Sequence, residues 1–234
     1  MRVLTWNVYF GGHMFEERCA ALTAELARRR PEVIALQEVT APLHEALATL
    51  GYWMSDDGAM FHELRYGVVI LARVPVRGAT VLDLPSEMGR KLITVELASG
   101  LRVASVHLES GRAEGPRRLE QLAVVQARLL RHHDVVWVGD MNFAPGTPED
   151  AAIDPSFIDV WTALHPGDPG YTLDTDLNTM RLQLKSNPAH RRIDRVFLRG
   201  TRLRARTIER VGTAPIDIDG TFVSDHFGLE VDLE

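Results

Sequence analysis

The sequence contains one cysteine and two lysines among its 234 residues. The single cysteine, Cys19, excludes an intramolecular disulfide framework. No apolar run approaches the roughly 18 residues that a membrane-spanning helix requires. The chain also enters a strand-like run at MRVLTWNV, without a charged leader followed by an apolar stretch and a cleavage site. We therefore expect a cytoplasmic protein that makes no contact with a membrane.

Several short catalytic signatures are also missing. The chain has no GxxxxGKS/T run, which argues against nucleotide-driven phosphoryl transfer. It has no GxSxG, which argues against a serine hydrolase. It has neither CxxC nor HxxxH, the close spacings that a zinc site would use.

The overall composition is that of an ordinary soluble domain, with 45% hydrophobic and 25% charged residues and a net charge of −6. The basic residues are unevenly distributed, and ten of the 26 lie in one stretch. They are Arg181, Lys185, Arg191, Arg192, Arg195, Arg199, Arg202, Arg204, Arg206 and Arg210. Such a strip can meet a phosphate-bearing ligand, although solvated arginines on strand edges explain it equally well. The pair Arg90-Lys91, just before a strand, is a further candidate for a phosphate contact.

Hydrophobic periodicity predicts helices over residues 14–30, 43–50 and 116–132. Strand-like runs include RVLTWNV, EVIALQEV, LRVASVHLES, VVWVGD, RRIDRVFLRG and FGLEVDLE, and a long loop region follows VVWVGD. Many strands with few helices favour two packed sheets with helices on their outer faces. No linker or short repeat divides the chain, so we expect one domain over residues 1–234.

Polar residues interrupt or end six of these apolar strands. They are Asn7, Glu38, His107, Asp140 with Asn142, Asp194, and Asp225 with His226. Each alone has an ordinary explanation as a cap, a turn residue or a satisfied core histidine. Burying such groups unpaired costs a few kcal/mol apiece, so their repetition predicts that the strand ends meet in one polar cluster. A carboxylate cluster of this kind needs a cation.

The residue types in this cluster indicate the cation and the chemistry. Carboxylate oxygens with a nearby amide suit Mg²⁺ or Mn²⁺. A hard divalent ion, an aspartate acting as a base and a histidine donor together favour hydrolysis of a phosphate ester.

These segments resemble the ordered motif set of the endonuclease/exonuclease/phosphatase superfamily. The motifs are TWN at 5–7, LQEV at 36–39, SVHLES at 105–110, GDMN at 139–142, RRIDRVF at 191–197 and SDH at 224–226. With DVW at 159–161 and YTLDT at 171–175, they are most similar to the 5′-tyrosyl-DNA phosphodiesterases. The resemblance implies an α/β fold, a four-layer α/β/β/α sandwich of two mixed β-sheets with outer helices.

The resemblance also implies roles for the polar residues. Glu38 would be the main Mg²⁺ ligand, with Asn7 and Asp225 completing or orienting its shell. Tyr9 and Phe10 stand where nucleases of the superfamily often carry an Asp-Gly pair, so one candidate carboxylate ligand is missing. This departure favours one metal ion over two, and the sequence leaves the number open.

The same resemblance implies the catalytic and substrate-binding residues. Asp140, aided by Asn142, would position and deprotonate the attacking water. His226, held by Asp194, would donate to a phosphate oxygen, and His107 would contact the same phosphoryl group. Ser110 and Arg112 match a hydroxyl and a basic residue that contact the substrate phosphate.

Two departures bear on the substrate. Leu173 replaces a tryptophan that stacks on a DNA base in the tyrosyl-DNA group, and the loop FAPG lacks an arginine that the group carries there. Base stacking contributes about 1–3 kcal/mol per base, so we expect weaker binding of single-stranded DNA.

We therefore predict a monomeric, Mg²⁺- or Mn²⁺-dependent phosphodiesterase that acts on nucleic-acid ends, such as a 5′-phosphotyrosyl-DNA bond. The alternative is hydrolysis of a small-molecule or lipid phosphate ester. A lipid enzyme would need an exposed aromatic hairpin or a signal peptide, and an inositol phosphatase would need a lysine-rich pocket. A non-catalytic binding module is a third possibility, which the completeness of the polar set argues against.

Overall fold

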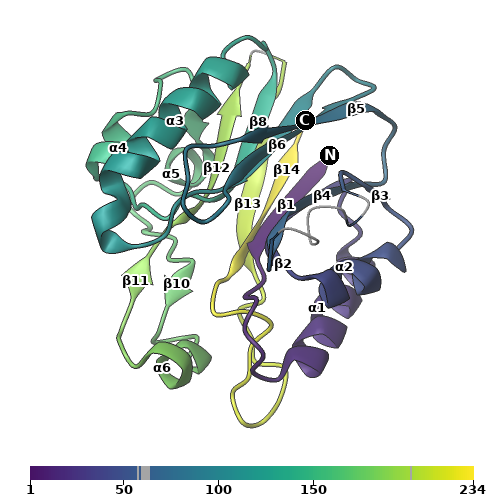
Figure 1. The fold of residues 1–234 in the computed structure, drawn as a ribbon, viewed down its shortest axis with the longest axis vertical. Coiled ribbons are helices and arrows are strands. Elements are labelled where there is room, and N and C mark those ends of the chain that lie inside the picture. The colour runs from purple at the N-terminus through teal and green to yellow at the C-terminus, as the bar shows by residue number, and fades with distance from the viewer. Residues whose placement is uncertain (57, 59–63, 201) are drawn as a thin grey trace.

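The computed structural model describes residues 1–56, 58, 64–200 and 202–234. Within them, the strands form two six-stranded mixed sheets and a two-stranded ribbon (Figure 1). The first sheet has the order β13-β14-β1-β2-β4-β3, formed by Ala205–Val211, Gly228–Leu233, Arg2–Asn7, Val33–Val39, Gly67–Ala72 and Trp53–Met54. The second has the order β5-β6-β7-β8-β12-β9, formed by Val76–Asp83, Lys91–Leu97, Arg102–His107, Val135–Asp140, Asp194–Arg199 and Ile158–Asp159.

The apolar residues of the central strands divide between two faces. In β1, Val3 joins the core between the sheets, whereas Leu4 and Trp6 join a core under the helices. In β8, Val136 likewise faces the inter-sheet core, whereas Trp137 faces outward into a third core. Successive side chains of a strand point to opposite faces, so a continuous apolar run supplies both layers at once. Three apolar cores therefore separate four layers.

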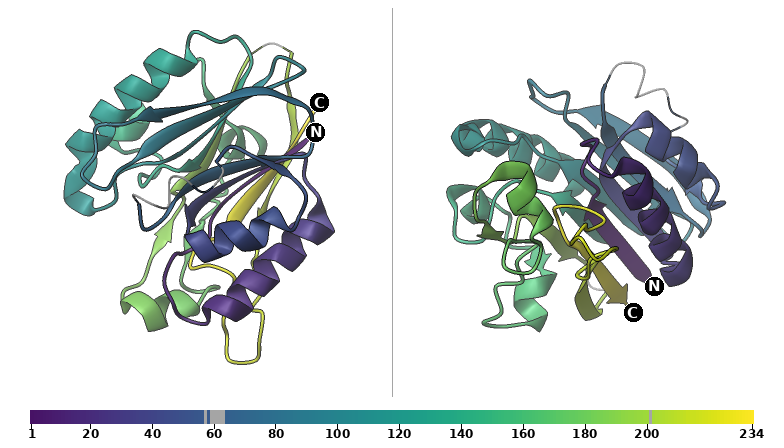
Figure 2. Two further views of the ribbon diagram at one scale, coloured as in Figure 1. Left: turned by 45° about the vertical axis from the view of Figure 1, so that its right-hand side comes forward. Right: turned by 90° about the horizontal axis from the view of Figure 1, so that it is seen from below.

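Helices close the two outer faces. The helices α1 (Phe15–Arg29) and α2 (Ala41–Ala48) lie on the first sheet, and α3 (Gly115–Leu129) lies on the second (Figure 2). This arrangement confirms the four-layer α/β/β/α sandwich. The helix predicted over 116–132 ends three residues earlier, at Leu129.

The segment after β8, expected to be a long loop, contains several short elements. They are α4 (Pro148–Ala151), β9, α5 (Val160–Leu164), β10 (Leu173–Asp174), α6 (Met180–Lys185) and β11 (His190–Arg191). The antiparallel pair β10 and β11 carries α6 and extends away from the two sheets (Figure 1). Elements of two to six residues are too short to show a hydrophobic period, which is why the sequence did not predict them.

The basic strip seen in the sequence is divided by the fold. Arg192 and Arg195 are buried and share the carboxylate of Asp159, with Arg192 Nη1 2.7 Å from Asp159 Oδ2. The Arg195 guanidinium also lies over the rings of Phe143 and Phe197. This part of the strip stabilises the packing of β9 on β12. None of the helices formed by the described residues has the length and hydropathy needed to cross a bilayer.

Candidate active site

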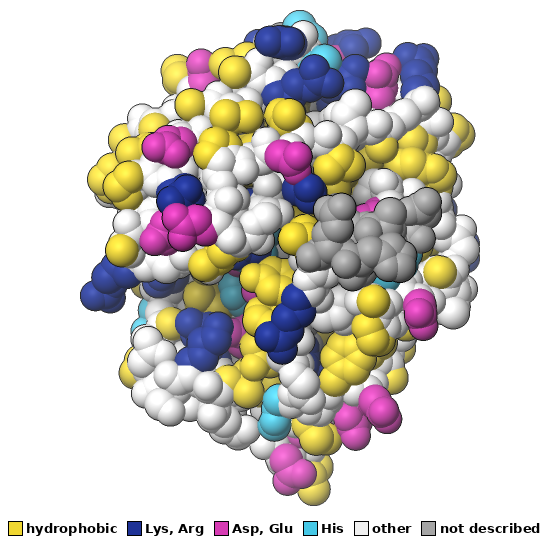
Figure 3. Space-filling view, viewed as in Figure 1, with side chains coloured by type: hydrophobic (Ala, Val, Ile, Leu, Met, Phe, Trp, Pro, Cys, Tyr) yellow, Lys and Arg dark blue, Asp and Glu magenta, His cyan; other side chains and the backbone are white. Residues whose placement is uncertain are grey.

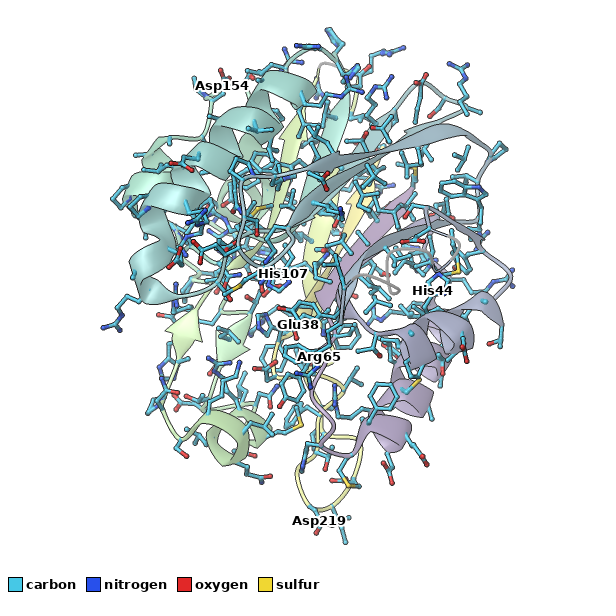
Figure 4. All side chains as sticks on the ribbon, viewed as in Figure 1. Glu38, His44, Arg65, His107, Asp154 and Asp219 are labelled. Atoms are coloured by element: carbon cyan, nitrogen blue, oxygen red, sulfur yellow. The ribbon has the colours of Figure 1, made fainter. Side chains whose placement is uncertain are left out.

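Strand register brings the predicted residues to one end of the sandwich. In the first sheet, β1 and β2 are parallel and pair Asn7 with Gln37, so Glu38 lies one residue beyond. In the second, β7 is parallel to β8, and β12 is antiparallel to it. His107, Asp140 and Asp194 are directly opposite one another in adjacent strands. Figure 4 shows Glu38 and His107 near the middle of the molecule.

Asp225 and His226 reach the same end because β14, which follows them, is antiparallel to β1. Two buried hydrogen bonds fix this connection to β1. Trp6 Nε1 donates to the His226 carbonyl at 2.8 Å, and Ser224 Oγ donates to the Asn7 carbonyl at 2.6 Å. The expected convergence of the strand ends is therefore present in the structure.

Three non-glycine residues of the site have a left-handed backbone conformation. The φ angles are 57° at Tyr9, 64° at Glu38 and 55° at Asn142. At Glu38 the ladder between β2 and β4 is irregular, which frees this residue from the regular pleat. Each such conformation costs about 1–3 kcal/mol and persists only where its surroundings hold it.

Hydrogen bonds to the site carboxylates supply that support. Phe10 N donates to Glu38 Oε2 at 2.9 Å, and Asn142 N donates to Asp140 Oδ1 at 2.9 Å. The Asn142 side chain also donates to the Leu108 carbonyl at 2.9 Å. These hydrogen bonds therefore stabilise the strained backbone and hold the two carboxylates in place.

Gly139 allows β8 to approach β7 closely just before Asp140. Its φ is 135°, and a Cβ atom built on it would lie 2.0 Å from the Val106 carbonyl oxygen. Only glycine fits both the conformation and the contact.

Asn7 links the carboxylates of the two sheets. Its Nδ2 donates to Glu38 Oε1 at 3.1 Å and to Asp140 Oδ2 at 2.9 Å. Burial and the neighbouring Asp194 carboxylate raise the pKa of Asp140 to about 6, although His226 and Asn7 oppose the rise. Asp140 is thus ionised at neutral pH, with a basicity near that of an efficient proton acceptor.

The two histidines that face Asp140 have opposite charge states. Burial alone would lower the pKa of His226, but the Asp194 and Asp225 carboxylates outweigh it and raise the pKa to about 10. His226 Nδ1 donates to Asp194 Oδ2 at 2.8 Å, and its Nε2 remains for the cavity. Burial, and secondarily the Arg90 charge, lowers the pKa of His107 well below its usual value. His226 is therefore a cation and His107 is neutral.

Asp225 lies among cations. Its Oδ2 is 2.7 Å from Arg181 Nη1 and 3.2 Å from Lys185 Nζ, both on α6. Burial opposes ionisation of Asp225, but His226, Lys185 and Arg181 outweigh it and lower its pKa. Its expected role as a metal ligand stays a prediction, since its carboxylate is paired with α6.

The donor set around Glu38 fits a hard divalent cation. Glu38 borders the cavity, and each of its oxygens accepts one hydrogen bond, from Asn7 or from Phe10. A carboxylate oxygen has two lone pairs, so each oxygen retains one for a cation. Oxygen ligands of this kind suit Mg²⁺ or Mn²⁺.

Asp140, Asp194 and His226 also bring one ligand atom each within 4.8 Å of the others. This second grouping is a poor cation site, because His226 is itself charged and is paired with Asp194. Glu38 stays the predicted ligand.

A cavity of about 840 Å³ lies over these groups. Glu38, Asp140, Asn142 and His226 border it, together with the predicted Ser110 and Arg112. Further basic residues also line it, and in the space-filling view basic side chains surround a hollow near the middle of this face (Figure 3). They are Arg90, Arg118, Arg181, Lys185 and Arg191.

Residues outside the predicted catalytic and metal-binding set also line the cavity. Phe10 and Tyr66 stack with their ring centroids 4.4 Å apart and border the cavity. Arg90 enters the site, whereas its neighbour Lys91 pairs with Asp83. Leu173 lies on β10 rather than in the expected loop, and it borders the cavity without an aromatic face. The sequence had singled out Arg90 and Leu173, whereas it gave no signal for the stacking of Phe10 on Tyr66.

Comparisons with known proteins identify the family of the sequence and proteins of similar fold. The model of the Endonuclease/Exonuclease/phosphatase family matches residues 4–226. Tyrosyl-DNA phosphodiesterase 2 of Xenopus laevis is 28% identical over 99% of the chain, which spans 66% of that relative's length. The structure of TDP2 from D. rerio, complexed with single-strand DNA product, superimposes with a TM-score of 0.88 at 24% identity, covering 100% and 98% of the two chains. The human Nocturnin catalytic domain with bound sulfate gives 0.75 at 18% identity, covering 100% and 93%.

Proposed function

The chain belongs to the endonuclease/exonuclease/phosphatase family, and we propose that it is a divalent-metal-dependent phosphodiesterase that hydrolyses phosphodiester bonds at DNA ends, including 5′-phosphotyrosyl bonds. One observation carries the proposal. A buried cationic His226 and an ionised Asp140 border the same cavity, so a donor for the phosphate and a base for water lie together.

The residues divide the chemistry among them. Asp140 accepts a proton from water as the water oxygen bonds to phosphorus and the phosphorus–leaving-group bond breaks. Asn142 N holds the other oxygen of Asp140 in place. His226 Nε2 donates to a non-bridging oxygen, where developing negative charge is stabilised most effectively in a buried site.

The cation would be held by Glu38, with Asn7 orienting that carboxylate through its amide. When bound, it supplies Lewis-acid stabilisation of the phosphoryl oxygens. Asp225 would complete or orient this shell, and His107 would contact the phosphoryl group from β7.

The cavity wall supports a polyanionic strand end as substrate. Arg112, Arg181, Lys185 and Arg191 present positive charge around the reacting groups. Leu173 offers no stacking face, so phosphate contacts supply most of the affinity. The relative from Xenopus laevis is named for cleavage of a tyrosyl-DNA phosphodiester. A tyrosyl phenolate, with a pKa near 10, is a good leaving group that needs little protonation.

The test is release of a 5′-phosphate end from a single-stranded oligonucleotide carrying a 5′-phosphotyrosyl group, with Mg²⁺ and with EDTA. We expect release only with metal and almost none from Asp140→Asn. Cleavage of bis(p-nitrophenyl) phosphate without cleavage of the oligonucleotide would refute the DNA substrate and favour a small phosphate ester. Absence of metal-dependent cleavage of either compound would refute the phosphodiesterase itself.

A further inference from the structure

Arg90 is a buried cation without a carboxylate partner. It is 5% exposed, and within the described residues no Asp or Glu oxygen lies within 4.0 Å of its guanidinium. Its Nη1 donates to His107 Nδ1 at 3.0 Å, and its Nη2 lies 3.4 Å from Met88 Sδ. Burying an arginine costs several kcal/mol unless its surroundings compensate the charge, so this placement needs an explanation.

Aromatic rings hold the guanidinium in place of a carboxylate. The carbon of the Arg90 guanidinium lies 5.5 Å from the Tyr66 ring centroid, and Phe10 stacks on that ring at an interplanar angle of 13°. Arg65 lies over Phe10 at 5.1 Å, so a cation flanks each end of the stack. Figure 4 labels Arg65, which lies over Phe10, and His107, which contacts Arg90. Aromatic faces attract a cation without adding negative charge beside an anionic substrate.

The contact with His107 determines which ring nitrogen carries the proton. A guanidinium has only donors, so His107 Nδ1 must accept with its lone pair. An imidazolium has no such lone pair, and the Nδ1-protonated tautomer would point a hydrogen at the arginine. Only the neutral Nε2-protonated form fits. Its Nε2 lies 3.5 Å from Asp140 Oδ2, on the side of the reacting groups.

We propose that Arg90 is a positioning residue that locks His107 in the neutral, Nε2-protonated form, so that a hydrogen-bond donor stays aimed at Asp140 and the phosphoryl group. The catalytic part of this role rests on the proposed function. His226, held by an anion, and His107, held by a cation, are then a charged and a neutral donor beside Asp140. The lowered pKa of His107 agrees with this assignment.

The test combines nitrogen-15 NMR of the histidine side chains with kinetics on the phosphodiester substrates above. His107 is assigned among the nine histidines by comparison with His107→Asn. In the wild type we expect an unprotonated Nδ1 and a protonated Nε2. Arg90→Met keeps an apolar stem without donors, whereas Arg90→Lys restores a donor. Arg77→Met, at an exposed arginine of β5 whose side chain is 59% accessible, is the matched control.

Arg90→Met should lose the single tautomer and lower kcat about 10–100-fold, the usual effect of removing the residue that orients a site histidine. Arg90→Lys should restore the tautomer and raise kcat above that of Arg90→Met, and Arg77→Met should change neither. A wild-type His107 protonated at Nδ1 overturns the proposal, as does an Arg90→Met enzyme with an unchanged tautomer or unchanged kcat. If the wild type cleaves no phosphodiester, the proposed function fails, while the NMR result still decides the Arg90–His107 contact.

Discussion

Replacing Gly139 by alanine should destabilise the protein and disturb the site at once. The alanine must adopt a φ of 135°, and its Cβ would lie 2.0 Å from the Val106 carbonyl oxygen. The unfavourable conformation costs about 1–3 kcal/mol. Relief of the clash needs a backbone shift between β7 and β8, which costs about 1–3 kcal/mol more. The expected loss is therefore about 2–6 kcal/mol.

Gly146→Ala provides the matched control within the same segment. Gly146 has a φ of 81°, but its Cβ would meet no atom within 4 Å. This variant carries the conformational cost without the clash. The difference between the two variants isolates the close approach of the strands.

Urea unfolding measures both losses, with the midpoint lowered and the m-value unchanged if only stability is affected. The shift between β7 and β8 should also break the 2.9 Å contact of Asp140 with Asn7, so kcat should fall in Gly139→Ala and persist in Gly146→Ala. Equal stabilities of the two variants would refute the argument from close approach.

Three further perturbations test other parts of the molecule. His226→Ala and Asp140→Asn should each lower kcat by about 100-fold or more, and turnover within a few-fold of wild type would remove that residue from its role. EDTA should abolish turnover, and Glu38→Gln should raise the Mg²⁺ concentration for half-maximal activity. An unchanged Mg²⁺ dependence in Glu38→Gln would show that Glu38 does not hold the cation. Asp159→Asn should cost about 3–5 kcal/mol at neutral pH, because buried Arg192 loses its carboxylate partner and buried Arg195 keeps only Asp150. Burial opposes the ionisation of Asp159, but the two arginines outweigh it and lower its pKa. The stabilisation that Asp159 contributes to the fold is therefore fully present above its unfolded pKa and is lost as the pH falls through the lowered value. The urea midpoints of the wild type and of Asp159→Asn should therefore differ at neutral pH and converge at acidic pH. A gap between them that stays constant with pH would contradict this assignment.

Where polar residues interrupt long apolar runs, the sequence predicts that the strand ends converge, and the structure shows that convergence. Asn7 and Asp140 end strands, and Glu38 is the penultimate residue of one. The other residues of these strands are almost all buried, so the three polar side chains require a common explanation. The same runs predict the layers, because a strand buried on both faces must lie between two cores. The predicted convergence of the strand ends and the predicted layers both depend on these long apolar runs.

Contacts made by ordinary residue types could not be predicted in this way. Arg90 precedes a strand, as many surface arginines do, and only the fold shows it against His107. The partner of Asp225 is Arg181, 44 residues away on a helix of six residues. No local pattern encodes such a pairing, because it depends on how the ribbon of β10 and β11 folds back.

The row formed by His107, Asp140 and Asp194 has a consequence for how the protein can change. The main chains at these three positions of β7, β8 and β12 are spaced as adjacent strands, about 4.7–4.9 Å apart, and the main-chain ladder sets this spacing whatever side chains the strands carry. Much of the cavity wall comes instead from loops, from α3 and α4, and from the ribbon that carries α6. Substitutions can therefore alter the cavity wall, and with it the molecule that enters the cavity. The row formed by His107, Asp140 and Asp194 keeps its main-chain spacing. The arrangement of the row and the shape of the cavity therefore depend on different parts of the chain.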